Sequence, residues 1–337
     1  MRMSAFLSLT LSVCCALALP GSAQNNSADP SQRLRGIELY GQKKYGEAAE
    51  VLKKAVKKNK SDADAWYYLG LALLQNPKTF KDSSKAFETT TKLRPNFADA
   101  HAGFAYLLLI RNKNESAARE ARAALALDTN IAEAYYVLGM TRLRTGAKEE
   151  ALENAETAIK LSPQIAPAYL LKSQALVTFL IDDVLSSEAA SESKKDRLRQ
   201  AAEALEKYLQ LIPNDSNRAT WVRQLESLRF HGHTSGPGEN KPVFSGKAVT
   251  TKARVTFKPE PIYTEEARRN GVTGTVVLRC VFTAAGEVRH CLIVKALPLG
   301  LTEQSLNAAR KVKFVPAMID GHPVNLFIQL EYNFNLY

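Results

Sequence analysis

A helical pattern recurs along most of this chain at intervals of about 34 residues. Large side chains mark equivalent positions at Trp66, His101, Tyr135 and Tyr169, which are separated by 35, 34 and 34 residues. A hydrophobic pattern that repeats at such an interval indicates stacked helix pairs, because each pair can bury its apolar face only against its neighbours. We therefore expect residues 31–230 to form an all-α array.

Small residues and prolines recur within the same pattern. The small residues include Gly70, Gly139, Ala48, Ala117 and Ala151, and the prolines that end three units are Pro95, Pro163 and Pro213. Small residues let two helix axes approach, and a proline after the second helix prevents its continuation. The spacing and residue set resemble the tetratricopeptide repeat. The unit that contains Ser83 and Thr90 departs from it, because alanines are usual at those positions.

The resemblance to the tetratricopeptide repeat implies about five helix pairs and a closing helix over 31–230. Such arrays curve, and their concave face usually holds a peptide or a segment of another protein. We therefore expect an unidentified protein or peptide as the partner of the array. The alternative, in which the array is only a spacer or a dimerisation element, stays open.

The pattern changes after the array. Apolar residues alternate through 276–283, a turn follows at 284–287, and a second strand is expected over 288–295. We also expect helices at 263–270 and 302–311 and a last strand over 324–335. Helices and strands in this order predict a second, small α+β domain at 252–337, built on an antiparallel sheet.

This second domain resembles the carboxyl-terminal domain of the TonB family. The residues that carry the resemblance are Pro261-Ile-Tyr263 with Ala267, Gly274-Thr-Val276, Ala285-Gly-Glu-Val288, Ala309 to Ala317, Asp320-Gly-His-Pro-Val324 and Tyr332-Asn-Phe-Asn-Leu336. Thr264 departs from the family, in which proline usually follows the tyrosine. The fold class expected for the chain is thus multidomain, an all-α solenoid followed by a TonB-like α+β domain.

The resemblance implies a binding edge. TonB-family domains lie in the periplasm and capture a short segment of an outer-membrane transporter by adding it to the edge of the sheet. A last strand that lies at an edge offers unpaired N–H and C=O groups for this purpose. The implied partner-binding residues are Pro261, Tyr263, Val324, Leu326, Ile328 and Leu330. The alternative is that these residues belong to a sheet that binds nothing.

Two cysteines, Cys280 and Cys291, flank the expected turn. If Ala285 and Gly286 form a two-residue turn, each cysteine lies five residues from it, and the two face each other at a separation that a disulfide can bridge. A three-residue turn would shift the pairing by one residue. We expect a disulfide, and two buried free thiols remain the alternative.

The amino terminus has the pattern of an export signal. Ala5–Leu19 is an uncharged, mostly apolar run, and Pro20–Ala23 supplies a helix break and small residues. We expect a signal peptide over 1–23, cleavage before Gln24 and a periplasmic location. Two alternatives are an uncleaved membrane anchor and a lipoprotein acylated at Cys14 or Cys15.

The net charge and the sequence motifs limit the classes of function and partner that we expect. The formal net charge of +11 is compatible with nucleic acid, an anionic membrane surface or an acidic polymer, and export argues against nucleic acid. Residues 231–251 read as a flexible linker, and His231 and His233 there lack further metal ligands. We expect no enzyme activity, catalytic residue, metal, cofactor or small-molecule substrate.

The sequence thus predicts a non-enzymatic protein of the TonB type that captures a partner segment by strand addition. Energy transduction for outer-membrane transport is what the resemblance implies. Family members that transduce energy carry an amino-terminal transmembrane helix, and the expected cleavage would remove the one apolar run here. The alternative is a scaffold or adaptor in an envelope assembly that transmits no force.

Overall fold

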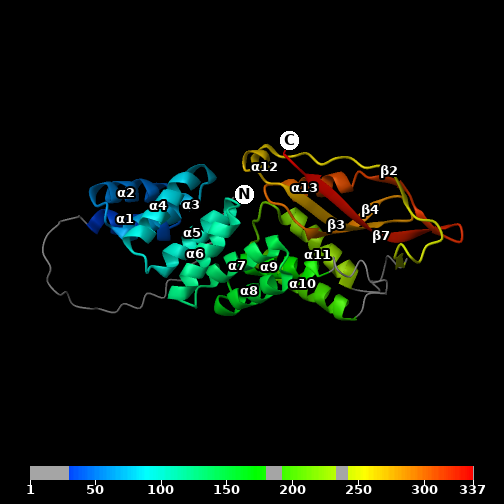
Figure 1. The fold of residues 1–337 in the computed structure, drawn as a ribbon, viewed down its shortest axis with the longest axis horizontal. Coiled ribbons are helices and arrows are strands. Elements are labelled where there is room, and N and C mark those ends of the chain that lie inside the picture. Colours follow the sequence, from blue (N-terminus) through cyan, green and yellow to red (C-terminus); the bar gives the residue numbers. More distant parts are fainter. Residues whose placement is uncertain (1–29, 180–191, 233–241, 337) are drawn as a thin grey trace. The chain divides into compact units, whose positions relative to one another are not determined.

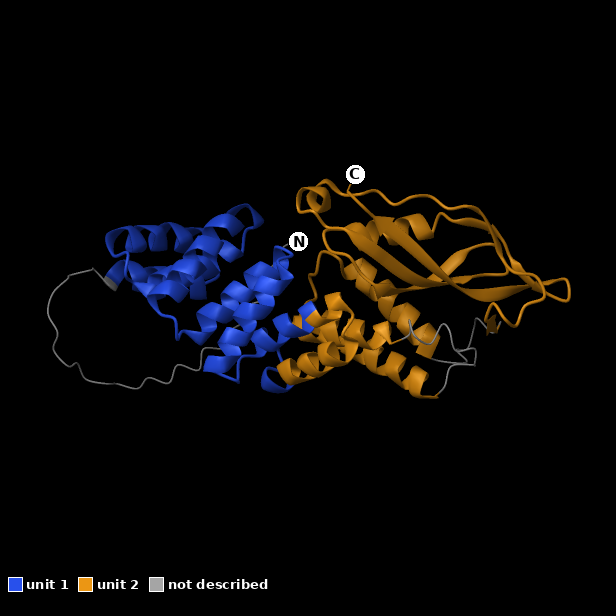
Figure 2. Ribbon diagram, in the orientation of Figure 1, with its two compact units in different colours: residues 1–141, 160–165 blue, residues 142–159, 166–337 orange. Residues whose placement is uncertain are grey.

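A computed structural model of the protein describes residues 30–179, 192–232 and 242–336. The expected signal peptide at 1–23 lies outside these residues. The chain divides into two compact units, Met1–Thr141 with Lys160–Ile165 and Arg142–Ile159 with Ala166–Tyr337 (Figure 2). Among the described residues, no helix has the length and apolar character needed to cross a membrane.

Helices follow one another through the first part of the chain (Figure 1). They are α1 (Pro30–Gly41), α2 (Tyr45–Lys58), α3 (Ala63–Leu74), α4 (Phe80–Leu93), α5 (Ala98–Ile110), α6 (Asn114–Leu127) and α7 (Ala132–Thr145). A short 3-10 turn, η1 (Pro77–Thr79), precedes α4. Within the first unit α1 packs on α2, α3 on α4 and α5 on α6. These helix pairs confirm the all-α solenoid that the period predicts.

Glycines in the first unit make room for the buried ring of Phe87. A Cβ added to Gly103 would lie 2.8 Å from Cε1 of Phe87, and one added to Gly70 would lie 3.1 Å from the same ring. The unusual Ser83 and Thr90 are also buried, and each is hydrogen-bonded. The Ser83 hydroxyl donates to the Gly70 carbonyl oxygen at 2.8 Å, and the Thr90 hydroxyl donates to that of Ala86 at 2.9 Å. A buried hydroxyl is tolerated when such a partner satisfies it.

The second unit continues the helical array and then adds a sheet. Its helices are α8 (Lys148–Leu161), α9 (Ala166–Thr178), α10 (Glu192–Leu211) and α11 (Arg218–Gly232). Leu205 of α10 and Leu228 of α11 are fully buried in one cluster. Helix α11 is the last helix before the sheet, and it packs on α10.

The sheet lies in the second unit and is mainly antiparallel. Its elements are β1 (Val243–Phe244), β2 (Arg254–Phe257), α12 (Glu265–Arg269), β3 (Gly274–Phe282), β4 (Val288–Lys295), α13 (Leu301–Ala309), β5 (Lys313–Val315), β6 (Ala317–Ile319) and β7 (His322–Phe334). The strand order is β1-β7-β3-β4, with β6 paired to the start of β7 and β2 paired with β5 separately. This arrangement confirms the small α+β domain.

Both faces of the sheet are covered by helices. Leu278 and Tyr332 face a core that includes Leu306 of α13. Val277 and Leu292 face the other way and join the cluster of α10 and α11. The helical array and the sheet domain thus share a core within the second unit.

The expected linker is shorter than the sequence predicts. His231 and Gly232 belong to α11, and Val243 and Phe244 pair in parallel with β7. Thr251 forms a bridge with Met318. A two-residue strand shows no alternation of its own, so its pairing depends entirely on the strand beside it. Residues 233–241 lie outside the described chain.

Candidate binding edge of the sheet

One side of β7 is open along most of its length. Strand β3 pairs with β7 from Leu326 to Phe334 on one side. On the other side β1 pairs with β7 only at Asn325 and Leu326. Within the described chain, no strand pairs with this side of residues 327–334. The open side of β7 therefore begins only after Leu326.

The register shows which main-chain groups reach this edge. The N–H of Thr283 donates to the carbonyl oxygen of Glu287, so odd-numbered residues of β3 direct their groups toward β4. Because successive residues of a strand point their groups to opposite sides, even-numbered residues of β3 pair with β7. Their partners in β7 are also even-numbered. The N–H and C=O groups of residues 327, 329, 331 and 333 therefore point outward.

Lys258 occupies part of this edge. Its Nζ donates to the main-chain oxygen of Glu331 at 2.7 Å and lies 4.7 Å from the ring centroid of Tyr332. Two prolines follow it, Pro259 and Pro261, and proline has no N–H to donate to a ladder. A lysine side chain thus caps an outward carbonyl of β7 without adding a strand to it.

Tyr332 has a buried hydroxyl beside this lysine. The side chain is 1% exposed, and its hydroxyl has no hydrogen-bond partner among the described residues. Burial, with a smaller contribution from the charge of Glu260, raises the pKa of Tyr332 to about 12. The phenol is therefore neutral at ordinary pH and remains an unused donor.

Most of the side chains that we expect to bind a partner are instead packed within the protein's own sheet domain. Leu326 and Leu330 are only 2% and 5% exposed, and Ile328 packs against the same core. Val324 pairs with Ala317 of β6. An added strand would therefore meet the main chain of β7 after Leu326 rather than these side chains.

Tyr263 also anchors the fold. Its hydroxyl donates to the carbonyl oxygen of Val272, and its ring lies 5.5 Å from that of Phe334. The half-buried Pro261 precedes it. Thr264, which replaces the usual proline, caps α12 by accepting a hydrogen bond from the N–H of Ala267 at 3.2 Å.

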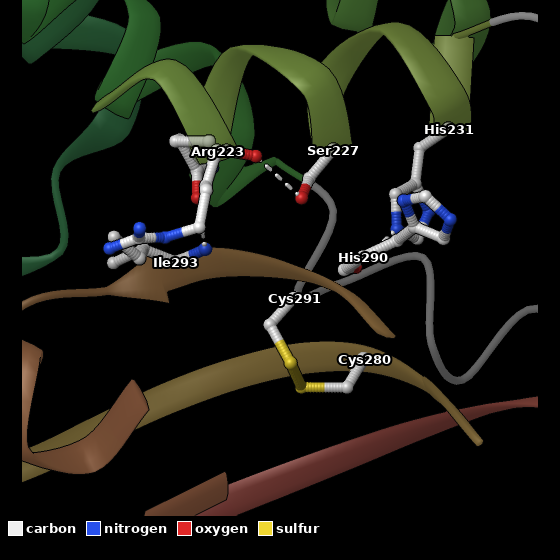
Figure 3. Close-up of a disulfide and its surroundings, with 8 residues drawn as sticks. Arg223, Ser227, His231, Cys280, His290, Cys291 and Ile293 are labelled. Carbon is white, nitrogen blue, oxygen red and sulfur yellow. Dashed lines mark hydrogen bonds between the residues drawn. A yellow bond between two sulfur atoms is a disulfide. The ribbon is translucent and has the colours of Figure 1, made fainter. Parts of the chain in front are cut away.

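The opposite edge of the sheet is covered by α11. The main-chain N–H of Ile293 in β4 donates to Oε1 of Gln224 at 3.1 Å. At the other end of the helix, Nε2 of His231 lies 2.9 Å from the main-chain oxygen of His290, and Phe230 stacks on the His290 ring at 3.8 Å. Helix α11 passes over β4 in Figure 3. A helix that satisfies edge groups in this way keeps them from pairing with another chain.

His231 is held neutral in this contact. Burial lowers the pKa of His231 to about 3, against the opposing effect of its hydrogen bond to His290. The charges of Arg279, His290 and Lys194 lower it further. Because the His290 oxygen can only accept, the neutral His231 ring carries its proton on Nε2.

The β3–β4 turn is the three-residue form that the sequence left open. Phe282 pairs with Val288, and the N–H of Gly286 donates to the carbonyl oxygen of Thr283 at 3.0 Å. Gly286 has a φ of 81°. The left-handed conformation at this position needs a glycine, and it lets a bulged turn close the hairpin.

A bulge in β4 restores the cysteine pairing that this turn would shift. The flanking pairs are Val281 with Arg289 and Arg279 with Leu292. Cys280 is therefore opposite two residues, His290 and Cys291, and His290 has a φ of 48°. The extra residue brings Cys291 to the side of Cys280, and a disulfide joins them in the structure (Figure 3). Two irregularities thus compensate each other.

The first unit contains a cluster of tyrosine rings. The Tyr40 and Tyr68 rings lie 5.7 Å apart, and those of Tyr68 and Tyr67 lie 5.3 Å apart. Burial raises the pKa values of Asp99 and Glu133, and the charge of Asp99 raises that of Glu133 further. No group of three or more metal-ligating side chains occurs in the described parts of the chain.

Comparison with protein families identifies both segments. The family described as Gram-negative bacterial TonB protein C-terminal matches residues 259–336. The tetratricopeptide repeat family matches residues 33–79 and 103–166. The chain therefore carries tetratricopeptide repeats followed by a domain of the TonB C-terminal type. Both kinds of domain serve protein interaction, and the TonB family is associated with the cell envelope.

Several solved structures match part of this chain. PilW, described as a type IV pilus biogenesis factor, matches with a TM-score of 0.48 and 16% identity over 61% of this chain and 88% of its own. A thermophilic tetratricopeptide protein of Thermus thermophilus matches with a TM-score of 0.45 and 15% identity over 59% and 98%. YrrB, described as having an unusual peptide-binding site, matches with a TM-score of 0.39 and 19% identity over 57% and 90%. At these TM-scores none of them supports a functional conclusion. No curated protein matches the chain significantly.

Proposed function

We propose that this chain is a non-enzymatic periplasmic protein that captures an extended segment of an envelope protein on the open edge of β7. The partner implied by the TonB-type domain is an outer-membrane transporter. The tetratricopeptide array is a second protein-binding module. The disulfide between Cys280 and Cys291 suits an oxidising compartment such as the periplasm.

The observation that supports strand addition is the unpaired side of residues 327–333. Four outward residues, 327, 329, 331 and 333, offer both donors and acceptors there. Lys258 bonds to the carbonyl oxygen of Glu331, and an extended peptide could pair with the main-chain groups of these four residues. The edge of β4 is unsuited to this role because α11 covers it, with Gln224 accepting from the N–H of Ile293 and His231 bonded to the His290 oxygen.

The array supplies a different kind of surface. Tyr40 and Tyr68 are half-buried, and rings of this type contribute large contact areas with little loss of side-chain freedom. The neighbouring carboxyl groups of Asp99 and Glu133 favour a basic segment over an acidic one. A partner of the array is therefore expected to differ from the partner of the sheet.

Two forms of the function remain distinct. In the first, the protein transduces energy to an outer-membrane transporter, as the TonB-type domain implies. In the second, it is an adaptor that holds one protein on the sheet and another on the array and transmits no force. The packing of α11 against β4 is compatible with both, because it fixes the end of the array to the sheet domain.

Photo-crosslinking in intact cells tests the binding edge. A photoreactive residue at Gln329, on the open side of β7, is expected to crosslink to an outer-membrane protein. The same residue at Lys295, at the end of β4, is the matched control and is expected to give no such product. Identical products from the two positions, or none from Gln329, would exclude this edge as the capture site.

A further inference from the structure

We infer that Lys258 is the gate residue of the β7 edge, which a partner segment must displace in order to bind. This inference rests on the proposed strand addition. The ammonium group of Lys258 donates to the main-chain oxygen of Glu331 at 2.7 Å. The N–H of an added strand would need the same oxygen, and it would approach from the same side.

The cap lies at the part of the edge that an added strand would use. Glu331 is one of the outward residues, with Gln329 before it and Asn333 after it. Lys258 also lies over the ring of Tyr332, at 4.7 Å, so its position is held by two contacts. A hydrogen bond from a charged donor is stronger than one between neutral groups, so the cap competes effectively with a peptide N–H.

The segment that carries Lys258 can protect the open side of β7, but it cannot pair with β7 as a partner strand would. Pro259 and Pro261 remove two N–H groups, so residues 258–261 cannot form a full ladder with β7. Lysines on exposed strands are a common protection against uncontrolled pairing, including pairing between two copies of one chain. Lys258 would therefore lower the affinity for any extended segment and reject those that bind weakly.

The geometry also defines the segment that can displace the cap. The outward residues 327, 329, 331 and 333 span seven positions. One end is bounded by β1, which pairs with Asn325 and Leu326, and the other by Tyr263, whose ring packs on Phe334. The partner is thus an extended stretch of about seven residues without proline at the positions that face β7.

Exposed apolar side chains bracket the gate in sequence. Phe257 is 57% exposed and Ile262 is 69% exposed. Large apolar groups that remain exposed to water are suited to contact with the apolar side chains of a partner. Such contacts would offset part of the free energy that is lost when the hydrogen bond from Lys258 to Glu331 is broken.

Displayed peptides provide the probe. Random dodecamers are selected on the full mature protein, and an uncharged peptide is chosen whose binding is lost in Gln329→Pro and retained in Gln329→Ala. Its affinity is then measured for the wild type, Lys258→Met, Lys258→Arg and Lys295→Met. Lys258→Met is expected to bind roughly three- to tenfold more tightly, the effect of about one hydrogen bond. Lys258→Arg and the matched control Lys295→Met are expected to bind like the wild type.

The possible outcomes test the gating role of Lys258 separately from strand addition on β7. Equal or weaker binding by Lys258→Met, for a peptide that Gln329→Pro abolishes, would overturn the gate and leave strand addition intact. Failure to select any peptide that depends on Gln329 would contradict strand addition and with it the gate. Sedimentation of Lys258→Met without peptide provides a second readout, because the uncovered edge is expected to increase self-association. No increase, together with unchanged peptide affinity, would also exclude the gate.

Discussion

The side-chain oxygen of Gln224 in α11 accepts a 3.1 Å hydrogen bond from the main-chain N–H of Ile293 in β4. This bond connects the last helix of the array to the outer strand of the sheet. Both partners are buried, at 6% exposure each. The N–H of Ile293, at the outer side of β4, is thereby satisfied within the chain.

Removing the acceptor at Gln224 is expected to destabilise the second unit. In Gln224→Met the N–H of Ile293 keeps its burial but loses its partner, which costs about 1–3 kcal/mol of unfolding free energy. Urea unfolding of the full chain measures this difference. The control Gln329→Met changes an exposed glutamine and is expected to have little effect. Equal stability of the two variants would show that water replaces Gln224.

Removing the disulfide is expected to destabilise the sheet domain as well. Cys280 and Cys291 are separated by 11 positions, and a short closed loop of this kind contributes about 2–4 kcal/mol. The variant with both cysteines changed to alanine is compared with the wild type by thermal unfolding. Mass measurement after alkylation in denaturant gives an independent check. Alkylation of both cysteines without reductant would establish two free thiols instead.

The second unit is expected to lose stability in acid through His231. The pKa of His231 is about 3 in the folded protein and about 6.5 in the unfolded chain. Between these values the unfolded chain binds a proton and the folded protein does not, so stability falls as pH falls, by about 1.4 kcal/mol per unit. Above pH 6.5 both states are neutral and the effect vanishes.

A variant isolates this effect from the titration of carboxyl groups. His231→Gln keeps a donor for the His290 oxygen but does not titrate. The difference in unfolding free energy between wild type and variant is expected to change between pH 6.5 and 4 and to be constant above pH 7. His322→Gln, at an exposed site, is the matched control. The same pH dependence in His231→Gln as in the wild type would refute the assignment.

Packing around Phe87 predicts a contrast between two glycines. In Gly103→Ala the new methyl group would lie 2.8 Å from the Phe87 ring, so overpacking is expected to cost about 1–3 kcal/mol. Gly46 lies in α2 with no atom within 4 Å of an added Cβ. Gly46→Ala is therefore expected to be neutral or to stabilise by up to about 1 kcal/mol, because alanine favours the helix. Thermal unfolding of the two variants gives the comparison.

The mature amino terminus distinguishes the two proposed forms of the function. Amino-terminal sequencing is expected to begin at Gln24, which would leave no anchor from the Ala5–Leu19 run and favour the adaptor. Retention of Met1 in the membrane fraction would instead favour a transducer coupled to the inner membrane.

Several features followed from pattern alone because they depend on local periodicity. The spacing of Trp66, His101, Tyr135 and Tyr169 predicted the helical solenoid, and the alternation around Leu278 predicted the hairpin. The sequence also contains an indication that the sheet is buried on both faces. Val276–Leu278 and Leu292–Val294 are continuous apolar runs. Such runs are typical of strands that are buried on both faces.

Other features depend on partners that are distant in the sequence. The contact between Gln224 and Ile293 joins positions 69 apart, and that between Lys258 and Glu331 joins positions 73 apart. The bulge at His290 could not be derived from its residue type, because histidine has no preference for that conformation strong enough to specify it. The exposed side of β7 likewise depends on the two-residue strand β1.

The sequence by itself determined the kinds of element, their order and the families they resemble, because helix and strand periods and turn residues act over short distances. Only the tertiary structure decided which strand edge stays open, which side chain caps it and where the array meets the sheet. Those outcomes depend on which main-chain groups find partners after packing, and a buried group accepts whichever partner the complete fold brings within hydrogen-bonding distance.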